Sequence, residues 1–171
     1  MTAVKGPDSA QDRQLKEWIE TYQGMLLKTC YLYLHDAALA EDAVQETFLK
    51  VYRALPSFRG ECGEKTWLMR IAVNVCRDMS KASWMRHHDR RFTPEDLPER
   101  AAPEREELPE LAVSIRALPP RLREPLLLYY DQDMTLEETA QALGISRSAV
   151  SRRLKAARGK LRDALEKEGE L

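Results

Sequence analysis

The chain has 171 residues and a formal net charge of −1, which suits one ordinary domain or two small ones and argues against a uniformly basic coat for nucleic acid. The polar segment Met1–Gln14 lacks the apolar core of a secretory signal, and no apolar run is long enough to span a membrane. The three cysteines have no metal-like spacing, so we expect thiols of a reducing compartment. These features predict a cytoplasmic protein with no membrane insertion, no metal and no cofactor.

Apolar residues recur at helical spacing along most of the chain, and no alternating run of β-branched residues predicts a strand. The expected fold class is therefore all-α, with two small helical modules joined by an acidic, proline-rich linker. The first module is predicted over residues 12–91, where Pro56 and Gly60 separate its last two helices. The predicted helices are one that begins near Asp12, Ala37–Leu55 and Lys65–Trp84.

The third of these helices mixes basic, amide and aromatic side chains on the face away from its apolar stripe. The residues on this face include Trp67, Arg70, Asn74, Arg77 and Lys81. Such a face suits single-stranded nucleic acid, because the cations follow the phosphates and the rings stack on unpaired bases. The alternative for Trp67 is a place in the core, the more usual position of a tryptophan on a helix.

Residues 92–108 differ in composition from both modules. Pro94, Pro98 and Pro103 oppose a helix in this segment, and six acidic residues outnumber Arg100 and Arg105. The segment has little to bury, so we expect a flexible acidic tether. The alternative is a long loop within a single domain, but such loops are uncommon in compact proteins.

The second module is predicted over residues 109–167, and its last part has the pattern of a helix-turn-helix. Thr135 and Glu138 have the spacing of a capping box at the start of the first helix. Gly144 suits the left-handed position that ends a helix, and Ser146 can cap the next one. Two helices joined by a short turn that contains glycine are typical of this motif.

The second helix of the motif carries seven basic residues and no acidic residue between Arg147 and Arg162. A helix of this charge behind such a turn is suited to the major groove, where arginine and serine can face base edges and phosphates. The alternative is a solvated helix on the surface of an ordinary bundle. Surface helices normally mix both signs of charge, however, and this one does not.

Several segments together resemble one family. They are Ala40–Phe48, Ser57–Gly60, Thr66–Asn74 and Leu118–Leu126, followed by the helix-turn-helix. In this order, with an acidic linker between the modules, they resemble the extracytoplasmic-function sigma factors, the smallest group of bacterial RNA polymerase sigma subunits. The resemblance implies a region 2-like first module that binds core polymerase and melts the promoter, and a region 4-like second module that reads the upstream element.

The resemblance also implies roles for individual residues. Phe58, Ile71 and Asn74 match positions around a pocket for a base flipped from the minus-ten element, and a flipped base needs an apolar wall and an amide to read its edge. With the basic face of the same helix, the minus-ten set is Phe58, Trp67, Arg70, Ile71, Asn74, Arg77 and Lys81. The minus-thirty-five set is Arg147, Ser148, Ser151, Arg152, Arg153 and Lys155. The contact with core polymerase is assigned to Asp42, Gln45 and Glu46.

The implied function is that of a sigma factor, which directs core RNA polymerase to specific promoters and assists melting without covalent chemistry. The implied partners are core RNA polymerase, double-stranded and melted promoter DNA, and an anti-sigma factor. A stand-alone helix-turn-helix regulator is an alternative, but it leaves the first module without a role. A recombinase would need a catalytic domain with a nucleophile, and a protein-interaction bundle would make no use of the basic helix.

Overall fold

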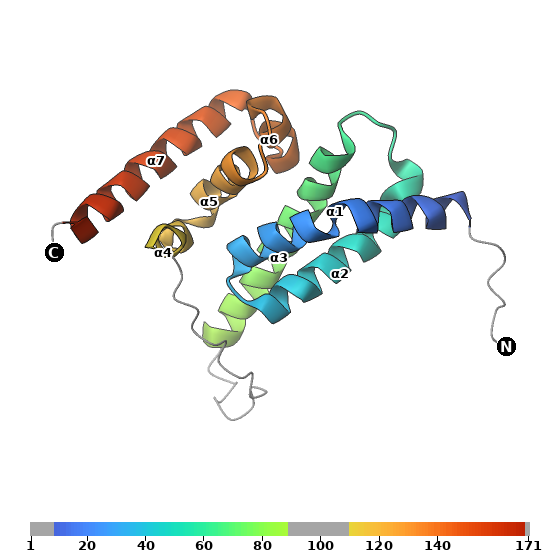
Figure 1. Ribbon diagram of the computed structural model, residues 1–171, viewed down its shortest axis with the longest axis horizontal. Helices are drawn as coiled ribbons and strands as arrows, with labels where there is room; N and C mark the ends of the chain where they lie inside the picture. The colour runs from blue at the N-terminus through green and yellow to red at the C-terminus, as the bar shows by residue number, and fades with distance from the viewer. Residues whose placement is uncertain (1–8, 89–109, 170–171) are drawn as a thin grey trace.

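The computed structural model describes residues 9–88 and 110–169, and every regular element in these ranges is helical. The first module comprises α1 (Ala10–Leu34), α2 (Ala37–Ala54), the short 3-10 turn η1 (Leu55–Ser57) and α3 (Glu64–His88). The second comprises α4 (Glu110–Ala117), α5 (Pro120–Leu126), η3 (Leu127–Asp131), α6 (Leu136–Leu143) and α7 (Arg147–Gly169). The two modules are visible in Figure 1, and the predicted all-α class is confirmed. The predicted tether, residues 92–108, lies outside the described residues.

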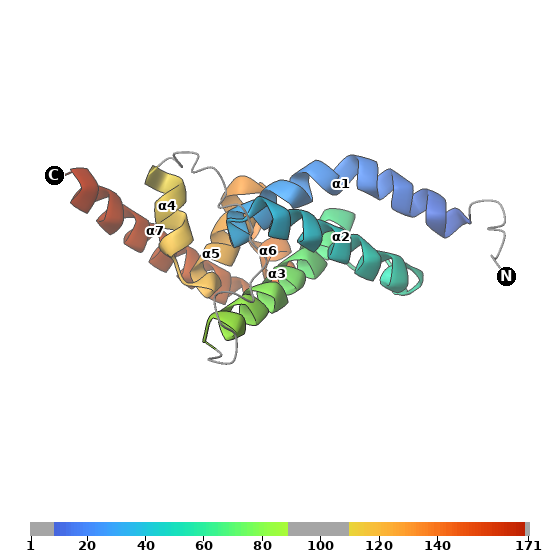
Figure 2. The ribbon, with the colours of Figure 1, turned by 90° about the horizontal axis from the view of Figure 1, so that it is seen from below.

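Side-chain caps fix the ends of the first two helices. Ser9 and Asp12 form a reciprocal capping box at the start of α1, and α1 ends at His35, whose φ of 55° is left-handed. Asp36 then caps α2 by accepting a hydrogen bond from the backbone N–H of Leu39. Because only two residues separate the helices, α1 and α2 pack along one another, and α3 crosses both, as Figures 1 and 2 show.

The second module contains the predicted helix-turn-helix. Thr135 and Glu138 form the expected capping box, and Gly144 ends α6 in the left-handed region with a φ of 65°. The oxygen of Ser146 accepts a hydrogen bond from the backbone N–H of Ala149 and so caps α7. The core of this module consists of small and branched apolar residues: Leu118, Leu122, Leu126, Ala140, Val150, Leu154 and Ala157.

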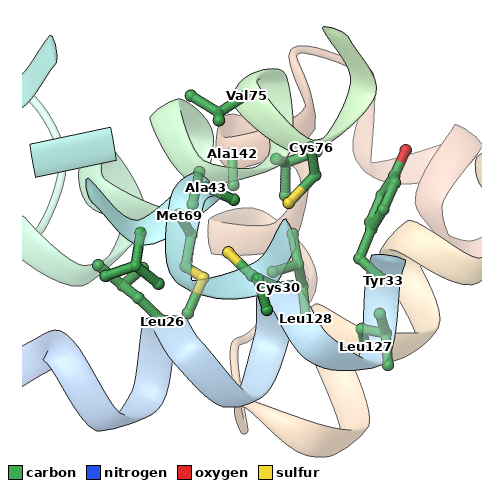
Figure 3. Close-up of a cluster of buried hydrophobic side chains, with 14 of the residues drawn as sticks. Leu26, Cys30, Tyr33, Ala43, Met69, Val75, Cys76, Leu127, Leu128 and Ala142 are labelled. Carbon is green, nitrogen blue, oxygen red and sulfur yellow. The ribbon is translucent and has the colours of Figure 1, made fainter. Parts of the chain in front are cut away.

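The two modules are packed against each other through a shared apolar core, which the sequence did not predict. Leu127, Leu128 and Ala142 of the second module enter the same cluster as Cys30 and Met69 of the first. Figure 3 shows these side chains converging between the helices. Contacts between α3 and α6 continue the junction beyond this core. The prediction of two helical modules is confirmed, but their association depends on residues far apart in the chain.

The three cysteines are free, as predicted. Cys30 on α1 and Cys76 on α3 are buried in the shared core, and their side chains point toward each other in Figure 3. A hydrogen bond with Cys30, together with burial, raises the pKa of the Cys76 thiol far above its usual range.

Within the described ranges, no helix is both long enough and apolar enough to cross a bilayer.

Candidate nucleic-acid and polymerase interfaces

Four residues of the predicted minus-ten set form one stripe along α3. Arg70, Asn74, Arg77 and Lys81 follow the helical spacing that brings side chains onto a common face. Arg70, Asn74 and Lys81 are exposed, whereas Arg77 is half-buried. Within the stripe, Nη1 of Arg77 donates a hydrogen bond of 3.3 Å to Oδ1 of Asn74. The stripe therefore presents cations and an amide to solvent, as a nucleic-acid surface requires.

An aromatic cluster lies at the N-terminal end of this stripe. The ring of Phe58, just after η1, is 4.6 Å from the ring of Trp67 on α3, with an interplanar angle of 31°. Both rings pack edge-on against the buried Trp18 of α1, at centroid distances of 5.7 and 5.9 Å. Phe58 and Trp67 are only half-buried. Trp67 therefore contributes to the core and still exposes part of its ring to solvent. It is neither a fully exposed stacking surface nor a fully buried core residue, the two alternatives that the sequence left open.

A cavity of about 390 Å³ opens beside the two rings. Its lining includes Phe58, Trp67 and Arg70 of the predicted set. Ile71 does not line it, because its side chain packs into the apolar clusters beneath α3. Asn74 is also outside the lining and lies one turn further along the exposed stripe.

The predicted set lacked five residues of the cavity lining: Ser57, Arg59, Glu61, Cys62 and Gln141. Arg59 follows Phe58 directly. A basic residue next to an aromatic one is a signal by which Arg59 could have been included in the predicted minus-ten set. Gln141 comes from α6 of the second module. Nothing near Gln141 in the sequence could have placed it here, because its position depends on how the two modules pack.

The predicted recognition helix α7 has one buried and one exposed face. Val150, Leu154 and Ala157 are buried against the rest of the second module. The exposed residues of the predicted set are Arg147, Ser148, Ser151, Arg152 and Lys155. Arg153 is instead half-buried and lines a cleft of about 280 Å³ together with Arg77 and Lys81 of α3. Most of the predicted set is thus exposed to solvent, and Arg153 faces the other module.

The predicted polymerase contact lies on α2. Asp42 and Gln45 are exposed there, and Glu46 is half-buried. Gln45 also lines a groove of about 720 Å³ between α1 and α2. Two large side chains of this groove, Leu49 and Tyr52, are 52% and 39% exposed. An amide beside exposed apolar and aromatic side chains is typical of a protein interface.

A buried carboxylate joins the two modules. Glu124 of α5 is 3% exposed and accepts hydrogen bonds from Arg77 on α3, at 2.8 Å from Nε and 2.6 Å from Nη2. It also accepts a bond of 2.7 Å from the hydroxyl of Tyr33 on α1. Burial and the neighbouring carboxylate raise the pKa of Tyr33, and the hydrogen bond with Glu124 raises that of Arg77. Tyr33 and Arg77 both carry their protons at neutral pH, and these shifts oppose the loss of either proton.

Arg123 strengthens the same junction from the neighbouring position. Its Nη1 donates a hydrogen bond of 2.8 Å to the backbone carbonyl of Tyr33, and its guanidinium lies 5.6 Å from the centre of the Tyr33 ring. At the edge of the junction, Lys28 forms an ion pair of 2.7 Å with Asp131.

Within the described residues, no group of three or more His, Cys, Asp or Glu could hold a metal ion.

The fold defines an all-helical protein with a helix-turn-helix, the class that places a helix in the major groove of DNA. Known families match both modules: Sigma-70 region 2 over residues 18–88, and Sigma-70 region 4 over residues 114–163. The RNA polymerase sigma-H factor of Pseudomonas aeruginosa is 31% identical over 182 residues, covering 91% of this chain and 94% of that protein. The RNA polymerase sigma factor NccH of Alcaligenes xylosoxydans xylosoxydans is 33% identical and covers 71% of this chain and 70% of its own length.

Solved structures share the fold. The sigma factor RpoE of Bartonella quintana, solved with the anti-sigma factor NepR, matches with a TM-score of 0.72 at 21% identity over 90% of this chain and 98% of its own. CnrH, solved with the cytosolic domain of CnrY, matches with a TM-score of 0.68 at 23% identity over 93% of this chain and 92% of its own. The chain belongs to the extracytoplasmic-function group of RNA polymerase sigma factors, which direct the polymerase to promoters.

Proposed function

We propose that this sigma factor divides the promoter between its two modules. The first module holds the melted minus-ten element, the second reads the double-stranded minus-thirty-five element, and α2 attaches both to core RNA polymerase. The observation that supports this division most strongly is the cavity beside Phe58 and Trp67, which opens at one end of the exposed basic stripe of α3. A stand-alone helix-turn-helix regulator would have no use for such a surface.

The cavity has the properties that a flipped base requires. Phe58 and Trp67 supply two rings, which can replace part of the stacking that a base loses when it leaves the duplex. Arg70 places a cation at the cavity, where a phosphate of the unpaired strand can approach. Asn74 and Lys81 continue the stripe along α3 and can follow the same strand. Ile71 supports this surface from below rather than by direct contact.

The exposed face of α7 is suited to the upstream element. Arg147 and Arg152 are exposed, and each can reach a base edge or a phosphate from a helix lying in the major groove. Ser148, Ser151 and Lys155 share the exposed surface. The family often has Lys or Arg where this chain has Ser151, so the preferred base opposite this position is expected to differ.

Further partners follow from the same reasoning. The exposed Asp42 and Gln45 of α2, with Glu46 beside them, are proposed to contact core polymerase. Because the Bartonella RpoE was solved with an anti-sigma factor, we expect an anti-sigma factor to bind this chain as well. The protein is proposed to act in the cytoplasm and to perform no covalent chemistry itself.

The function can be tested by reconstitution with purified core polymerase on promoter DNA. Wild-type protein should make thymines of the minus-ten element reactive to permanganate, because the strand there becomes unpaired. Arg70→Gln removes a cation from the cavity and should reduce this reactivity several-fold. Lys167→Gln removes an exposed cation near the far end of α7 and serves as the matched control. Equal reactivity with Arg70→Gln and Lys167→Gln would contradict the assignment of the cavity.

A further inference from the structure

Two clefts with cations in their walls adjoin where α5 and α7 pack together near α3. One cleft, of about 280 Å³, includes four cations in its lining: Arg77, Lys81, Arg121 and Arg153. The other, of about 340 Å³, includes three: Arg121, Arg152 and Arg153. Because Arg121 and Arg153 line both clefts, the clefts are neighbours, and five different cations surround them.

The two linings contain a single carboxylate, and its charge is already paired. Glu124 accepts hydrogen bonds of 2.8 and 2.6 Å from Arg77 and one of 2.7 Å from Tyr33. Among the described residues, the other four cations form no ion pair: Lys81, Arg121, Arg152 and Arg153. Uncompensated positive charges gathered in this way repel one another, and an anion that bridged them would relieve the repulsion.

The shape of the clefts favours a compact ligand over duplex DNA. Small-molecule sites are concave and commonly have volumes of about 300–1,000 Å³, and each of these clefts lies near the lower end of that range. Arg77 and Arg153 are half-buried on walls that belong to different modules, so a ligand must enter the cleft to contact both. A duplex can lie across an exposed helix face, but it is too wide to enter clefts of this size.

The donors in these walls match phosphate groups. A guanidinium can donate two parallel hydrogen bonds to one phosphate, and a lysine adds a compact positive charge. Cations spread over two adjoining clefts suit an anion whose charges are spread as well, because a single phosphate can contact only some of them. The ring of Tyr33 lines the first cleft but is 2% exposed, so it offers no surface on which a base could stack. The phosphates should therefore supply the affinity.

We propose that the two clefts form a binding site for a polyphosphate, a short chain of linked phosphate groups that is either free or part of a nucleotide. Arg121 and Arg153 contact the middle of the chain, and Lys81 and Arg152 contact its ends. This site goes beyond the proposed function, which gives Arg121 no role. A bound polyphosphate also neutralises Lys81 and Arg152, so it competes with promoter DNA. That consequence alone rests on the proposed function of these two residues.

The test is isothermal titration calorimetry of the full-length free protein with inorganic tripolyphosphate at low salt. Arg121→Gln removes an exposed cation shared by both clefts and should weaken binding by about tenfold or more, because it removes charge-assisted hydrogen bonds. Arg153→Gln should have a similar effect. Arg162→Gln, the same change at an exposed position of α7 outside both linings, is the matched control and should bind as the wild type does. Circular dichroism checks that each variant is folded.

Two further ligands identify what the site recognises. Orthophosphate should bind at least about tenfold more weakly than tripolyphosphate, since it cannot bridge the two clefts. ATP that binds more tightly than tripolyphosphate would identify a nucleotide as the ligand, whereas equal or weaker binding would identify the phosphate chain alone.

Two results would overturn the site. One is the absence of tripolyphosphate binding to the wild-type protein. The other is an equal loss of affinity in Arg121→Gln and Arg162→Gln, which would show general attraction to a positive surface. The titration contains neither DNA nor polymerase, so its failure leaves the proposed function intact. A failed permanganate test would refute the proposed function without changing the titration.

Discussion

Glu124 accepts two hydrogen bonds from the guanidinium of Arg77 across the boundary between the modules, at 2.8 and 2.6 Å. The carboxylate is 3% exposed, so each residue is the main charged partner that the other has at the junction. Removing one partner of a fully buried pair typically costs about 3–5 kcal/mol, and the cost here should be smaller because the Arg77 side chain is 33% exposed to solvent. Arg77 also belongs to the candidate minus-ten surface, so the junction and that surface share this residue.

The exposed arginines of α7 should read sequence. If Arg152 makes a bidentate contact with guanine, Arg152→Ala should cost about 1–3 kcal/mol and relax specificity at a single position of the upstream element. Competition binding of the polymerase complex to a set of single-base promoter variants measures this. An equal loss on every upstream sequence would show that Arg152 contacts a phosphate instead. Lys167→Gln, near the far end of α7, is a control for loss of one positive charge.

Promoter opening should be separable from promoter binding on α3. Asn74 is exposed, so Asn74→Ala should change stability by less than about 0.5 kcal/mol. Its amide can contact a base only after the strands separate, so the variant should form closed complexes normally and open complexes poorly. Gel mobility shift assays and permanganate reactivity measure the two steps. Normal opening by Asn74→Ala would exclude this residue from contact with the melted strand.

Phe58 should behave differently from Asn74, because its ring supports the aromatic cluster as well as the cavity. Phe58→Ala removes contacts with both Trp18 and Trp67 and should lower stability. The loss should be less than the ~3–5 kcal/mol typical of a fully buried phenylalanine, since Phe58 is half-buried. Chemical denaturation gives the stability, and opening is then compared at a temperature where the variant remains folded. A variant as stable as the wild type would show that the cluster contributes nothing to the fold.

Replacing either of two glycines of the second module by alanine should change the stability of the module, but in opposite directions. Gly144 has a φ of +65°, so Gly144→Ala should destabilise the module by about 1 kcal/mol, although a Cβ there would meet no atom within 4 Å. Gly159 lies inside α7, so Gly159→Ala should stabilise it by about 0.5–1 kcal/mol. Thermal denaturation of both variants tests the turn. Stabilisation by Gly144→Ala would contradict the left-handed end of α6.

His35 should make the packing of the modules sensitive to acid. Its pKa is lowered from 6.5 to about 4 by burial and by the nearby charges of Arg116 and Arg123. Its Nε2 atom is also buried without a hydrogen-bond partner among the described residues. The folded state therefore favours the neutral ring. The stability that this provides is complete above pH 6.5 and is lost as the pH falls from 6.5 towards 4.

Scattering and denaturation at pH 7.5 and pH 5 test this dependence. The effect should be smaller than the full ~1.4 kcal/mol per pKa unit, because the ring is only half-buried and solvent screens its charge. His35→Asn is the control, since asparagine tolerates the left-handed φ of 55° but does not titrate. An identical decline in stability for His35→Asn and the wild type would assign the acid sensitivity to other groups.

Local patterns were sufficient to predict much of this molecule. The capping box of Thr135 and Glu138 and the helix end at Gly144 involve residues close in sequence, and the structure confirms them. The helical spacing of Arg70 and Asn74 likewise predicts that both lie on one face of α3, and both are exposed there. Such features depend on geometry within one or two turns of a helix, which the sequence shows directly.

The junction between the modules could not be predicted in this way. Glu124 stands between Arg123 and Pro125, where it resembles an ordinary surface acid, and its partner Arg77 is 47 residues away. Gln141 similarly reaches the cavity beside Phe58 only through the packing of α6 near α3. Contacts of this kind depend on tertiary arrangement, and no periodicity or local motif encodes them.

The most direct test of the central claim is to sequence the 5′ ends of transcripts made by core RNA polymerase with and without this protein. The account predicts new starts that share a pair of upstream motifs at fixed spacing. Replacing Arg152 by Ala should alter the preferred upstream motif while leaving the downstream one unchanged. The absence of protein-dependent starts, or binding to the same DNA sites with equal affinity when polymerase is omitted, would contradict the claim that the protein acts as a promoter-directing subunit.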